Sequence, residues 1–596
     1  MPGLSRRRFI AGVTGLAVGL GLTSEALGRA LASVPRARDV RSTLLETIKF
    51  SSRPIRGSYH TLVSGAGEDF ITRLDVLGKS ANPQRVTSRR SLFYVAHLSD
   101  IHLIDAQTPS RMEPMVGLAK TTFSDAFRPQ ELMSTHVLAS MMVAVREASI
   151  SQVTGAPLAA VVNTGDSADM LNDLETSWYI NVLDGGSITP NSGTPGVYEG
   201  VQVWADAPYA YHPDDPAQDP YGEYGFPQLP GLLTAAVSQE VSSLGLPVPW
   251  YAVYGNHDAM FMGTFGVQSQ LRSWAVGSRK AATWEALGGT SIAGLASEPS
   301  AFQRFTNSLR TNLGLVPGIH SVAPDSRRRL LERTEFMQAH LDSPAFPGPV
   351  GHGFTPENVS SGRTYWKADP APYIRLLGLD TCNETVGADG GVPEEQFEWV
   401  KAELDAARNE GVLCVILSHH NSLTLENDAQ PVFGGPRIVH AEEFIAALLE
   451  RPNCIAWMNG HTHINTINAH SSADGSTGFW EITSASVIDY PQQQQLIEIA
   501  DNRDGTISIF VTALDHASDA EWVDGDYSTR GLASLSREFA ANDWVQNPPM
   551  RWGSPLDRNT ELLLPAPFDM SRISDSTVEA TMMTARARLI KAGVEA

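Results

Sequence analysis

Five segments of the chain end in side chains that commonly bind metal ions, and each ending follows a run of apolar residues. The segments are HLSDIHL (97–103), VVNTGD (161–166), VYGNHD (253–258), ILSHHN (416–421) and MNGHTH (458–463). They supply as candidate ligands Asp100, His102, Asp166, Asn256, His419, His461 and His463. Imidazole, carboxylate and amide oxygen together suit Mn, Fe or Zn. None of the three cysteines forms a CxxC pair, which argues against a thiolate-held structural zinc.

One such ending alone is more often ordinary polarity at the end of a strand. Five in succession are different, because the strands of an α/β sheet bring their carboxyl ends to one crevice. We therefore expect these side chains to meet in space. They are too many for one ion, so the sequence predicts two ions that share a carboxylate, an arrangement suited to in-line displacement at phosphorus.

The elements that must position these side chains alternate between apolar strands and amphipathic helices over about residues 92–513. Well-marked helices are expected over 129–149 and over 393–411, the second with Pro at its start and Gly at its end. Three later runs are expected to form consecutive antiparallel strands, at 478–489, 494–501 and 505–514. This order predicts a layered α/β architecture with mixed sheets.

At 596 residues the chain is longer than a single hydrophobic core usually serves. We expect residues 92–515 to form the main domain, interrupted by insertions at about 167–247 and 259–368. An N-terminal extension (33–91) and a C-terminal extension (516–596) flank it, and the latter is expected to pack on the domain. Insertions of this length are usually lids or binding elements. The tyrosines of the first insertion could stack on a nucleobase or a sugar, but we expect them mainly to pack the loop onto the domain.

The first residues of the chain have the pattern of an export signal. Arg6 and Arg7 precede an apolar run over 11–23, and a small-residue ALA site follows at 30–32. We interpret residues 1–32 as a twin-arginine (Tat) signal peptide, the alternatives being an ordinary secretory signal or an uncleaved anchor. The expected partner is the Tat export machinery, and the expected location is extracellular, periplasmic or in the cell envelope. No later segment has the length and apolarity of a stable transmembrane helix.

Net charge restricts the range of partners. The sequence holds 44 Lys and Arg against 66 Asp and Glu, a formal charge of −22. A surface this acidic repels phosphate polymers at long range, so we expect a small phosphorylated substrate and no nucleic acid polymer. The cysteines are an odd number, and buried thiols are expected in place of a disulfide framework.

The order of motifs, DIH, GD, GNHD, H and GHTH, resembles the calcineurin-like metallophosphoesterase superfamily, and the leader suggests an exported bacterial subgroup. The resemblance implies a layered α/β/β/α sandwich and two divalent or trivalent ions, Mn, Fe or Zn. It implies one subsite made by Asp100, His102 and His463, a second made by Asn256, His419 and His461, and Asp166 as the bridge. The implied activity is hydrolysis of phosphate mono- or diesters by a metal-bridging hydroxide.

Further roles follow from the same resemblance. His257 would protonate the leaving oxygen or stabilise the phosphorane-like charge, and Asp258 would orient its imidazole. Asn256 and His257 would also contact the substrate, as would His420 if it is not a purely structural neighbour. Asp169 occupies the position where purple acid phosphatases have a tyrosine, so an Fe(III)–tyrosinate site is not expected. The alternative function is a non-catalytic exported or envelope-associated binding protein that retains the fold.

Several neighbouring residues are interpreted as structural. His97 is expected to pack in the core, because it points away from Asp100 on the same strand. Asp380 also ends a strand but is left outside the metal set. Gly255 and Gly460 are expected to be turn glycines that let the backbone approach the ions.

Overall fold

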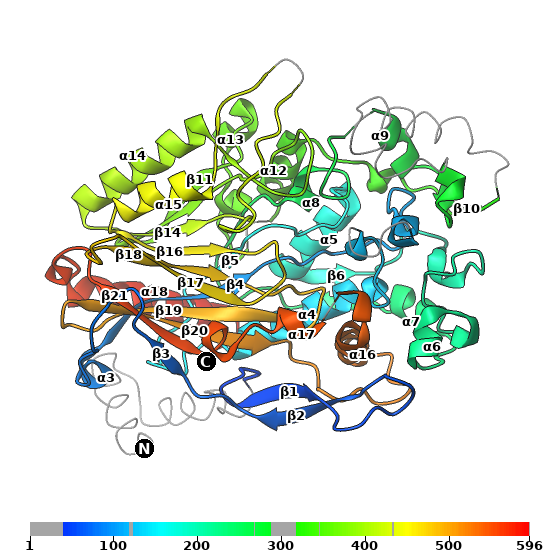
Figure 1. The fold of residues 1–596 in the computed structure, drawn as a ribbon, viewed down its shortest axis with the longest axis horizontal. Helices are drawn as coiled ribbons and strands as arrows, with labels where there is room; N and C mark the ends of the chain where they lie inside the picture. The colour runs from blue at the N-terminus through cyan, green and yellow to red at the C-terminus, as the bar shows by residue number, and fades with distance from the viewer. Residues whose placement is uncertain are drawn as a thin grey trace.

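The computed structural model describes residues 40–594, except for 118–122, 268, 288–316, 345, 432–433 and 547. The expected signal peptide, residues 1–32, therefore lies outside the described residues. Two mixed sheets form the centre of the molecule (Figure 1). The seven-stranded sheet has the order β3 (Ile71–Arg73), β21 (Thr560–Pro565), β20 (Thr506–Asp515), β19 (Gln493–Asp501), β4 (Arg90–Leu98), β5 (Ala160–Asn163) and β8 (Trp250–Ala252). The six-stranded sheet has the order β11 (Trp366–Ala371), β12 (Ile374–Gly378), β14 (Leu413–Leu417), β16 (Cys454–Asn459), β18 (Gly478–Thr483) and β17 (Thr466–Ser471).

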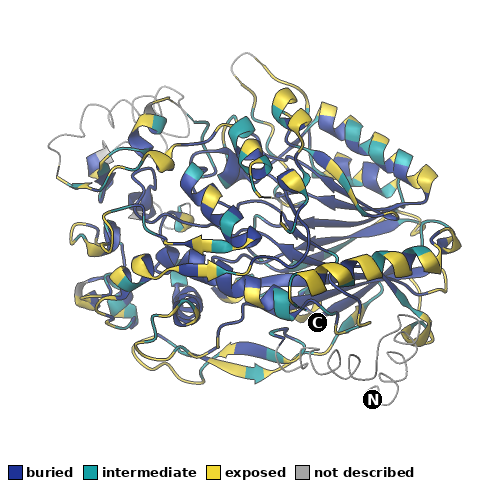
Figure 2. Ribbon diagram, turned by 180° about the vertical axis from the view of Figure 1, so that it is seen from behind, coloured by how far each residue is buried: buried dark blue, intermediate teal, exposed yellow. Residues whose placement is uncertain are grey.

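Helices cover the outer faces of the two sheets. The helices α14 (Glu394–Glu410) and α15 (Ala441–Leu449) pack on the six-stranded sheet. On the other side of the molecule, α4 (Ser134–Glu147) packs on the seven-stranded sheet and contacts α16 (Thr529–Asn542). Figure 2 shows the sheets as buried and the outer helices as exposed on one side only. The expected α/β class with layered, mixed sheets is confirmed.

The alternation of side chains along β14 explains why the layers stack in this way. Leu413, Val415 and Leu417 join the core between the two sheets, whereas Cys414 and Ile416 pack with α14 and α15. A strand sends successive side chains to opposite faces, so an uninterrupted apolar run is buried on both.

The local sequence also accounts for α14. Its buried residues Phe397, Val400, Leu404 and Ala407 recur at spacings of three and four, which places them on one face. The helix ends at Gly411, which adopts the left-handed conformation (φ 75°) that glycine accommodates at little cost. The expected helix over 393–411 is thus present.

The strand directions bring the motif-bearing ends together. In the seven-stranded sheet β4, β5 and β8 run parallel, and in the six-stranded sheet β12, β14, β16 and β18 run parallel. The endings identified in the sequence follow β4, β5, β8, β14 and β16.

The late strands differ from the expected meander. β19 and β20 form an antiparallel hairpin, but β18 belongs to the other sheet, where it pairs with β16 and β17. The reason is that β18 is buried on both faces, with Trp480 in the intersheet core and Phe479 packed beneath the helices. The chain must therefore cross between the sheets over residues 484–492.

The seven-stranded sheet also extends past the expected limits of the main domain. β21 pairs with β20, and β3 pairs with β21, so the segments before residue 92 and after residue 515 each supply a strand. β21 itself lies in the expected C-terminal extension (516–596). Its two partners, β20 and β3, are distant in the sequence, so the local pattern alone does not identify it as a strand of this sheet.

A second core lies beneath the first insertion. Tyr211 and Tyr221 are buried, and their rings lie 5.2 Å from Phe539 and 4.9 Å from Trp544. These tyrosines pack the insertion onto the C-terminal segment, in agreement with the packing interpretation. The three cysteines are buried and free, as expected. Among the helices of the described chain, none combines the length and the apolarity that crossing a membrane requires.

Candidate metal centre

The seven predicted ligands lie in turns directly after strands. Asp100 and His102 follow β4, Asp166 follows β5, and Asn256 begins the short helix α8 (Asn256–Ala259) after β8. His419 follows β14, and the last two histidines follow β16. Segments that follow the carboxyl ends of strands in both sheets thus contribute candidate ligands to one centre.

The backbone at this centre is unusual. Five of the seven residues have left-handed backbone angles: Asp100 (φ 51°), His102 (φ 43°), Asp166 (φ 51°), His461 (φ 69°) and His463 (φ 57°). Residues other than glycine rarely adopt this conformation, because it costs energy. Strained residues cluster at functional sites, so this group of five marks a candidate site.

The first subsite contains two imidazoles and a carboxylate. The Nε2 atoms of His102 and His463 lie 3.2 Å apart, and His463 Nε2 lies 3.2 Å from Oδ1 of Asp100. His102 Nε2 is also 3.5 Å from Oδ2 of Asp166. Candidate ligand atoms of Asp100, His102 and His463 all lie within 4.8 Å of one another.

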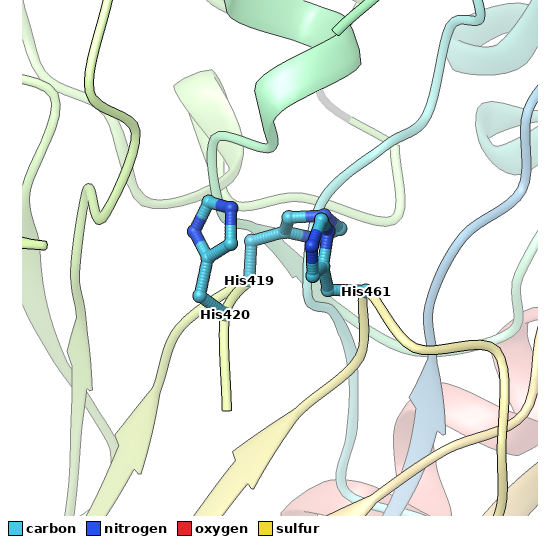
Figure 3. A group of neighbouring side chains, drawn as sticks. All are labelled: His419, His420 and His461. Atoms are coloured by element: carbon cyan, nitrogen blue, oxygen red, sulfur yellow. The ribbon is translucent and has the colours of Figure 1, made fainter. Parts of the chain in front are cut away.

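The second subsite shares Asp166 with the first. His419 Nε2 lies 3.1 Å from Asp166 Oδ2 and 3.2 Å from His461 Nδ1. Figure 3 shows the rings of His419 and His461 close together, with the His420 ring to one side. Asn256 donates from Nδ2 to the carbonyl of Gly263 at 3.0 Å. Its buried Oδ1 has no hydrogen-bond partner in the part of the chain that the structure describes.

The donor set fits bound cations. His102 and His463 each use Nδ1 toward a carboxylate, Asp169 Oδ1 at 3.1 Å and Asp489 Oδ2 at 2.7 Å. A carboxylate accepts, so each Nδ1 carries the hydrogen and each Nε2 presents a lone pair. Two lone pairs that face each other at 3.2 Å, beside the carboxylate of Asp100, require a shared cation or a proton between them.

The electrostatics of the metal-free centre agree with this geometry. Burial lowers the pKa of His463, but Asp100 and Asp489 outweigh it and raise that pKa to about 9. His419 has a pKa of about 9 for the same reason, since Asp166 and Asp100 outweigh burial. Protons thus occupy positions that suit metal cations.

His257 is oriented by a main-chain group. Its Nδ1 lies 2.8 Å from the carbonyl oxygen of Asp169, and its backbone N–H donates to Asp166 Oδ1 at 2.8 Å. A carbonyl only accepts, so Nδ1 carries the hydrogen and Nε2 is the nitrogen that can exchange a proton. The side chain is 18% exposed, which leaves it accessible at the edge of the centre.

Asp258 has a different position from the one expected. Its carboxylate accepts hydrogen bonds from the backbone N–H groups of Ser167, Ala168 and Gly255 instead of contacting the His257 ring. Burial and the nearby Asp166 raise the pKa of Asp258 to about 7. The side chain therefore joins the turn after β5 to the start of α8, and the expected role in orienting the imidazole falls to the carbonyl of Asp169.

His420, expected as a substrate contact, uses both ring nitrogens within the protein. Its Nε2 donates to the carbonyl of Ala388 at 2.8 Å, and its Nδ1 accepts from the hydroxyl of Thr381 at 2.8 Å. Burial and the neighbouring histidines keep its pKa well below the usual range, so the ring is neutral. His420 joins two loops beside the centre and has no nitrogen left for a ligand.

Asp169 and Asp489 are the residues of the centre that sequence reasoning missed. Asp169 lies three residues after Asp166, and its sequence position indicated only that the tyrosine of purple acid phosphatases is absent here. Asp489 ends the strand expected over 478–489, and this position is the one signal that could have identified it, although β18 itself ends at Thr483.

The neighbouring residues interpreted as structural lie outside the cluster of candidate ligands. His97 is buried between Gln495 and Thr164, and Asp380 accepts from the backbone N–H of Cys382. Gly255 and Gly460 allow close approach to the two carboxylates. An added Cβ would lie 2.3 Å from Asp166 Oδ1 at Gly255 and 2.2 Å from Asp100 Oδ2 at Gly460.

No protein-family model matches this chain, and no curated protein matches it. Two phosphatases are among the solved structures that are weakly similar to it. One is a dimetal phosphatase from Danio rerio, 12% identical, with a TM-score of 0.30 and coverage of 72% of this chain and 100% of that chain. The other is a purple acid phosphatase from yellow lupin (Lupinus luteus) seeds, 9% identical, with a TM-score of 0.26 and coverage of 76% of this chain and 53% of that chain. The chemistry of the centre is inferred from the side chains of this chain.

Proposed function

We propose that this protein is a metal-dependent phosphoesterase with a dinuclear centre. The observation that carries the proposal is that two buried carboxylates and four imidazoles form overlapping clusters, and that five of these six residues have left-handed backbone angles. In this proposal one ion is held by Asp100, His102 and His463, the other by Asn256, His419 and His461, and Asp166 contributes to both. The unpartnered oxygen of Asn256 supports its role as a ligand.

When bound, two ions of Mn, Fe or Zn would neutralise phosphate oxygens and lower the pKa of a water that attacks phosphorus. The protein supplies the proton for the other side of the reaction. His257 holds a proton on Nε2 and transfers it to the leaving oxygen as the bond from phosphorus to that oxygen breaks. The hydrogen bond from Nδ1 to the Asp169 carbonyl keeps the ring in the orientation that leaves Nε2 accessible.

We propose small phosphate mono- or diesters as substrates. The net charge of −22 disfavours nucleic acid polymers, whereas a small anion needs only the local positive charge of the ions. The Arg6–Arg7 pair and the apolar run after it support export through the Tat pathway.

The direct test is metal analysis of the purified full chain combined with a panel of phosphoesters that includes p-nitrophenyl phosphate and bis-p-nitrophenyl phosphate. We expect two ions per chain and hydrolysis of at least one panel member. Preference for the diester over the monoester would identify a diesterase. Two bound ions without turnover of any ester would overturn the proposal and favour the binding protein.

A further inference from the structure

Two buried aspartates outside the predicted ligand set hold the histidines of the first subsite. Asp169 Oδ1 lies 3.1 Å from His102 Nδ1, and Asp489 Oδ2 lies 2.7 Å from His463 Nδ1. Both aspartates are almost fully buried, with 2% and 1% of their surface exposed. Burying two further carboxylates beside Asp100 is costly unless each has its own cationic partner.

Each aspartate has such a partner, and the partners are arginines. Arg111 forms an ion pair with Asp169 and a second one with Glu131 at 2.9 Å. Arg128 contacts Asp489 from Nε at 2.7 Å and from a terminal nitrogen at 3.2 Å. Because a guanidinium is planar and permanently charged, these contacts fix the orientation of the carboxylate.

Asp489 has a second arginine that comes from the C-terminal segment. Arg551 ends the short helix α17 (Pro548–Arg551), and its guanidinium lies 3.2 Å from Asp489 Oδ2. The same side chain is held by Gln546, through the carbonyl at 3.0 Å and the amide oxygen at 2.6 Å. A segment that begins after residue 515 thus reaches the first subsite through one aspartate.

The second subsite lacks a comparable arrangement among the described residues. His419 Nδ1 donates to the main-chain carbonyl of Thr164 at 2.9 Å. The ring of His461 has only a distant carboxylate: its Nε2 lies 3.8 Å from Oδ1 of Asp389, whose side chain is 50% exposed. The two subsites therefore differ in charge around their histidines, since one is supported by buried carboxylates and the other mainly by main-chain groups.

We propose that Asp169 and Asp489 are positioning residues for the first subsite, and that Arg551 ties the C-terminal segment to it. The proposal rests on the proposed function only in assuming that the centre binds two ions. A carboxylate that accepts from Nδ1–H fixes the tautomer and the ring orientation, and it makes Nε2 a stronger donor to a metal. The arginines in turn hold each carboxylate in place.

The test is a titration of the metal-free full chain with Mn²⁺. Calorimetry measures the affinity of each site, and electron paramagnetic resonance reports whether the bound ions are coupled. In the wild type we expect two sites and, at saturation, the spectrum of two coupled ions. Asp489→Asn and Asp169→Asn keep the side-chain volume but remove the charge. Each is expected to weaken one of the two sites by about 10- to 100-fold and to leave the other unchanged. With one equivalent of Mn²⁺ these variants should give the spectrum of an isolated ion.

Arg551→Met tests the link to the C-terminal segment, and Arg558→Met is its matched control. Arg558 lies in the same segment and is similarly buried, but it pairs with Glu68 at 2.7 Å, away from the proposed ligands. We expect Arg551→Met to weaken one Mn²⁺ site by about fivefold and Arg558→Met to leave both sites unchanged. If Asp489→Asn fails to fold, Arg551→Met still provides the test.

Equal weakening of both sites by Asp489→Asn, or equal effects of the two arginine variants, would overturn the proposal. Because Mn²⁺ binding is measured without substrate, the outcome is separate from that of the proposed function. A chain that binds two ions with these variant effects but hydrolyses no ester retains the positioning role and loses the enzymatic one. A wild type that binds none of Mn²⁺, Fe²⁺ and Zn²⁺ contradicts both.

Discussion

Asp166 is the residue through which the two proposed subsites meet, since its Oδ2 lies 3.5 Å from His102 Nε2 and 3.1 Å from His419 Nε2. Replacing it by Asn removes the shared charge and should weaken both sites together, by more than the ~10- to 100-fold typical of an outer-sphere partner. Metal content after dialysis and turnover of the preferred ester measure the effect.

The control for this variant is Asp380→Asn. Asp380 also ends a strand and is buried, but its carboxylate accepts from Thr364 and from the backbone N–H of Cys382. We expect its replacement to leave metal content unchanged. Loss of metal in both variants would mean that Asp166 acts through stability alone.

The effect of replacing His257 should depend on the leaving group of the substrate. His257→Asn should keep both ions, because its ring nitrogen Nδ1 is bonded to the Asp169 carbonyl and the ligand set remains intact. The turnover rate should fall by about 10²- to 10⁴-fold for esters of alkyl alcohols. The loss should be much smaller for p-nitrophenyl esters, whose leaving oxygen needs no proton. Equal losses for both substrates would contradict the role of His257 as the acid.

The pKa values of about 9 for His419 and His463 predict proton release when metal binds. At pH 7 both imidazoles carry a proton in the metal-free protein, and a metal requires the neutral form. Each histidine should release one proton when Mn²⁺ binds, and affinity should rise with pH up to about 9. Calorimetry in buffers with different ionisation enthalpies measures this release directly.

The same pKa values predict how the stability of the metal-free protein changes with pH. Both pKa values are raised above the unfolded value of about 6.5, so the two protonated histidines stabilise the folded state. Their contribution to the free energy of unfolding is complete below pH 6.5 and is lost as pH rises through 9. We expect the free energy of unfolding in a chelator to decrease between pH 6.5 and 9. An increase over this range would contradict the assignment of the protons.

At the scale of elements, the turns after the strands matter more than the strands themselves. Each turn must aim a side chain inward while a neighbouring turn passes close by, and glycine permits that approach. An added Cβ at Gly460 would lie 1.9 Å from Ser99 Oγ and 2.2 Å from Asp100 Oδ2.

Gly460→Ala should therefore displace Asp100 and lower the free energy of unfolding by about 1–3 kcal/mol, the usual effect of overpacking. Denaturant unfolding and metal content check this outcome. The control is Gly277→Ala, where the nearest atom is the Trp274 carbonyl oxygen at 3.1 Å. We expect it to cost less and to leave metal content unchanged. Full metal content in Gly460→Ala would contradict the packing argument.

At the scale of the whole molecule, the centre depends on segments from both ends of the described chain. β3 and β21 complete the seven-stranded sheet, and Arg551 reaches Asp489 from beyond the main domain. We therefore expect such a centre to form only when both segments have folded. Export of a folded protein, which the Tat pathway provides, would suit this requirement.

Export can be tested at the same scale. Changing Arg6 and Arg7 together to Lys keeps the positive charge but removes the paired arginines on which the proposed signal depends. We expect the double variant to accumulate inside the cell as a folded, metal-binding protein, as measured by fractionation. Unchanged export would contradict a Tat signal and favour an ordinary secretory signal.

The sequence alone was sufficient to predict where candidate ligands would be found. An apolar run followed by Asp, Asn or His is a local pattern, and parallel strands bring such endings to one edge whatever the details of packing. The layered α/β class and the helix over 393–411 could be predicted for the same reason, because periodicity and capping residues act within a few positions.

Only the tertiary structure decided which partner each side chain meets. The sequence places His420 next to His419, yet the loop that holds Thr381 and Ala388 uses both of its ring nitrogens. Asp258 meets backbone N–H groups instead of His257, and Asp489 meets His463 from the segment that follows β18. Hydrogen-bond partners, burial and the proton carried by each imidazole depend on residues tens to hundreds of positions away, and no local pattern in the sequence contains them.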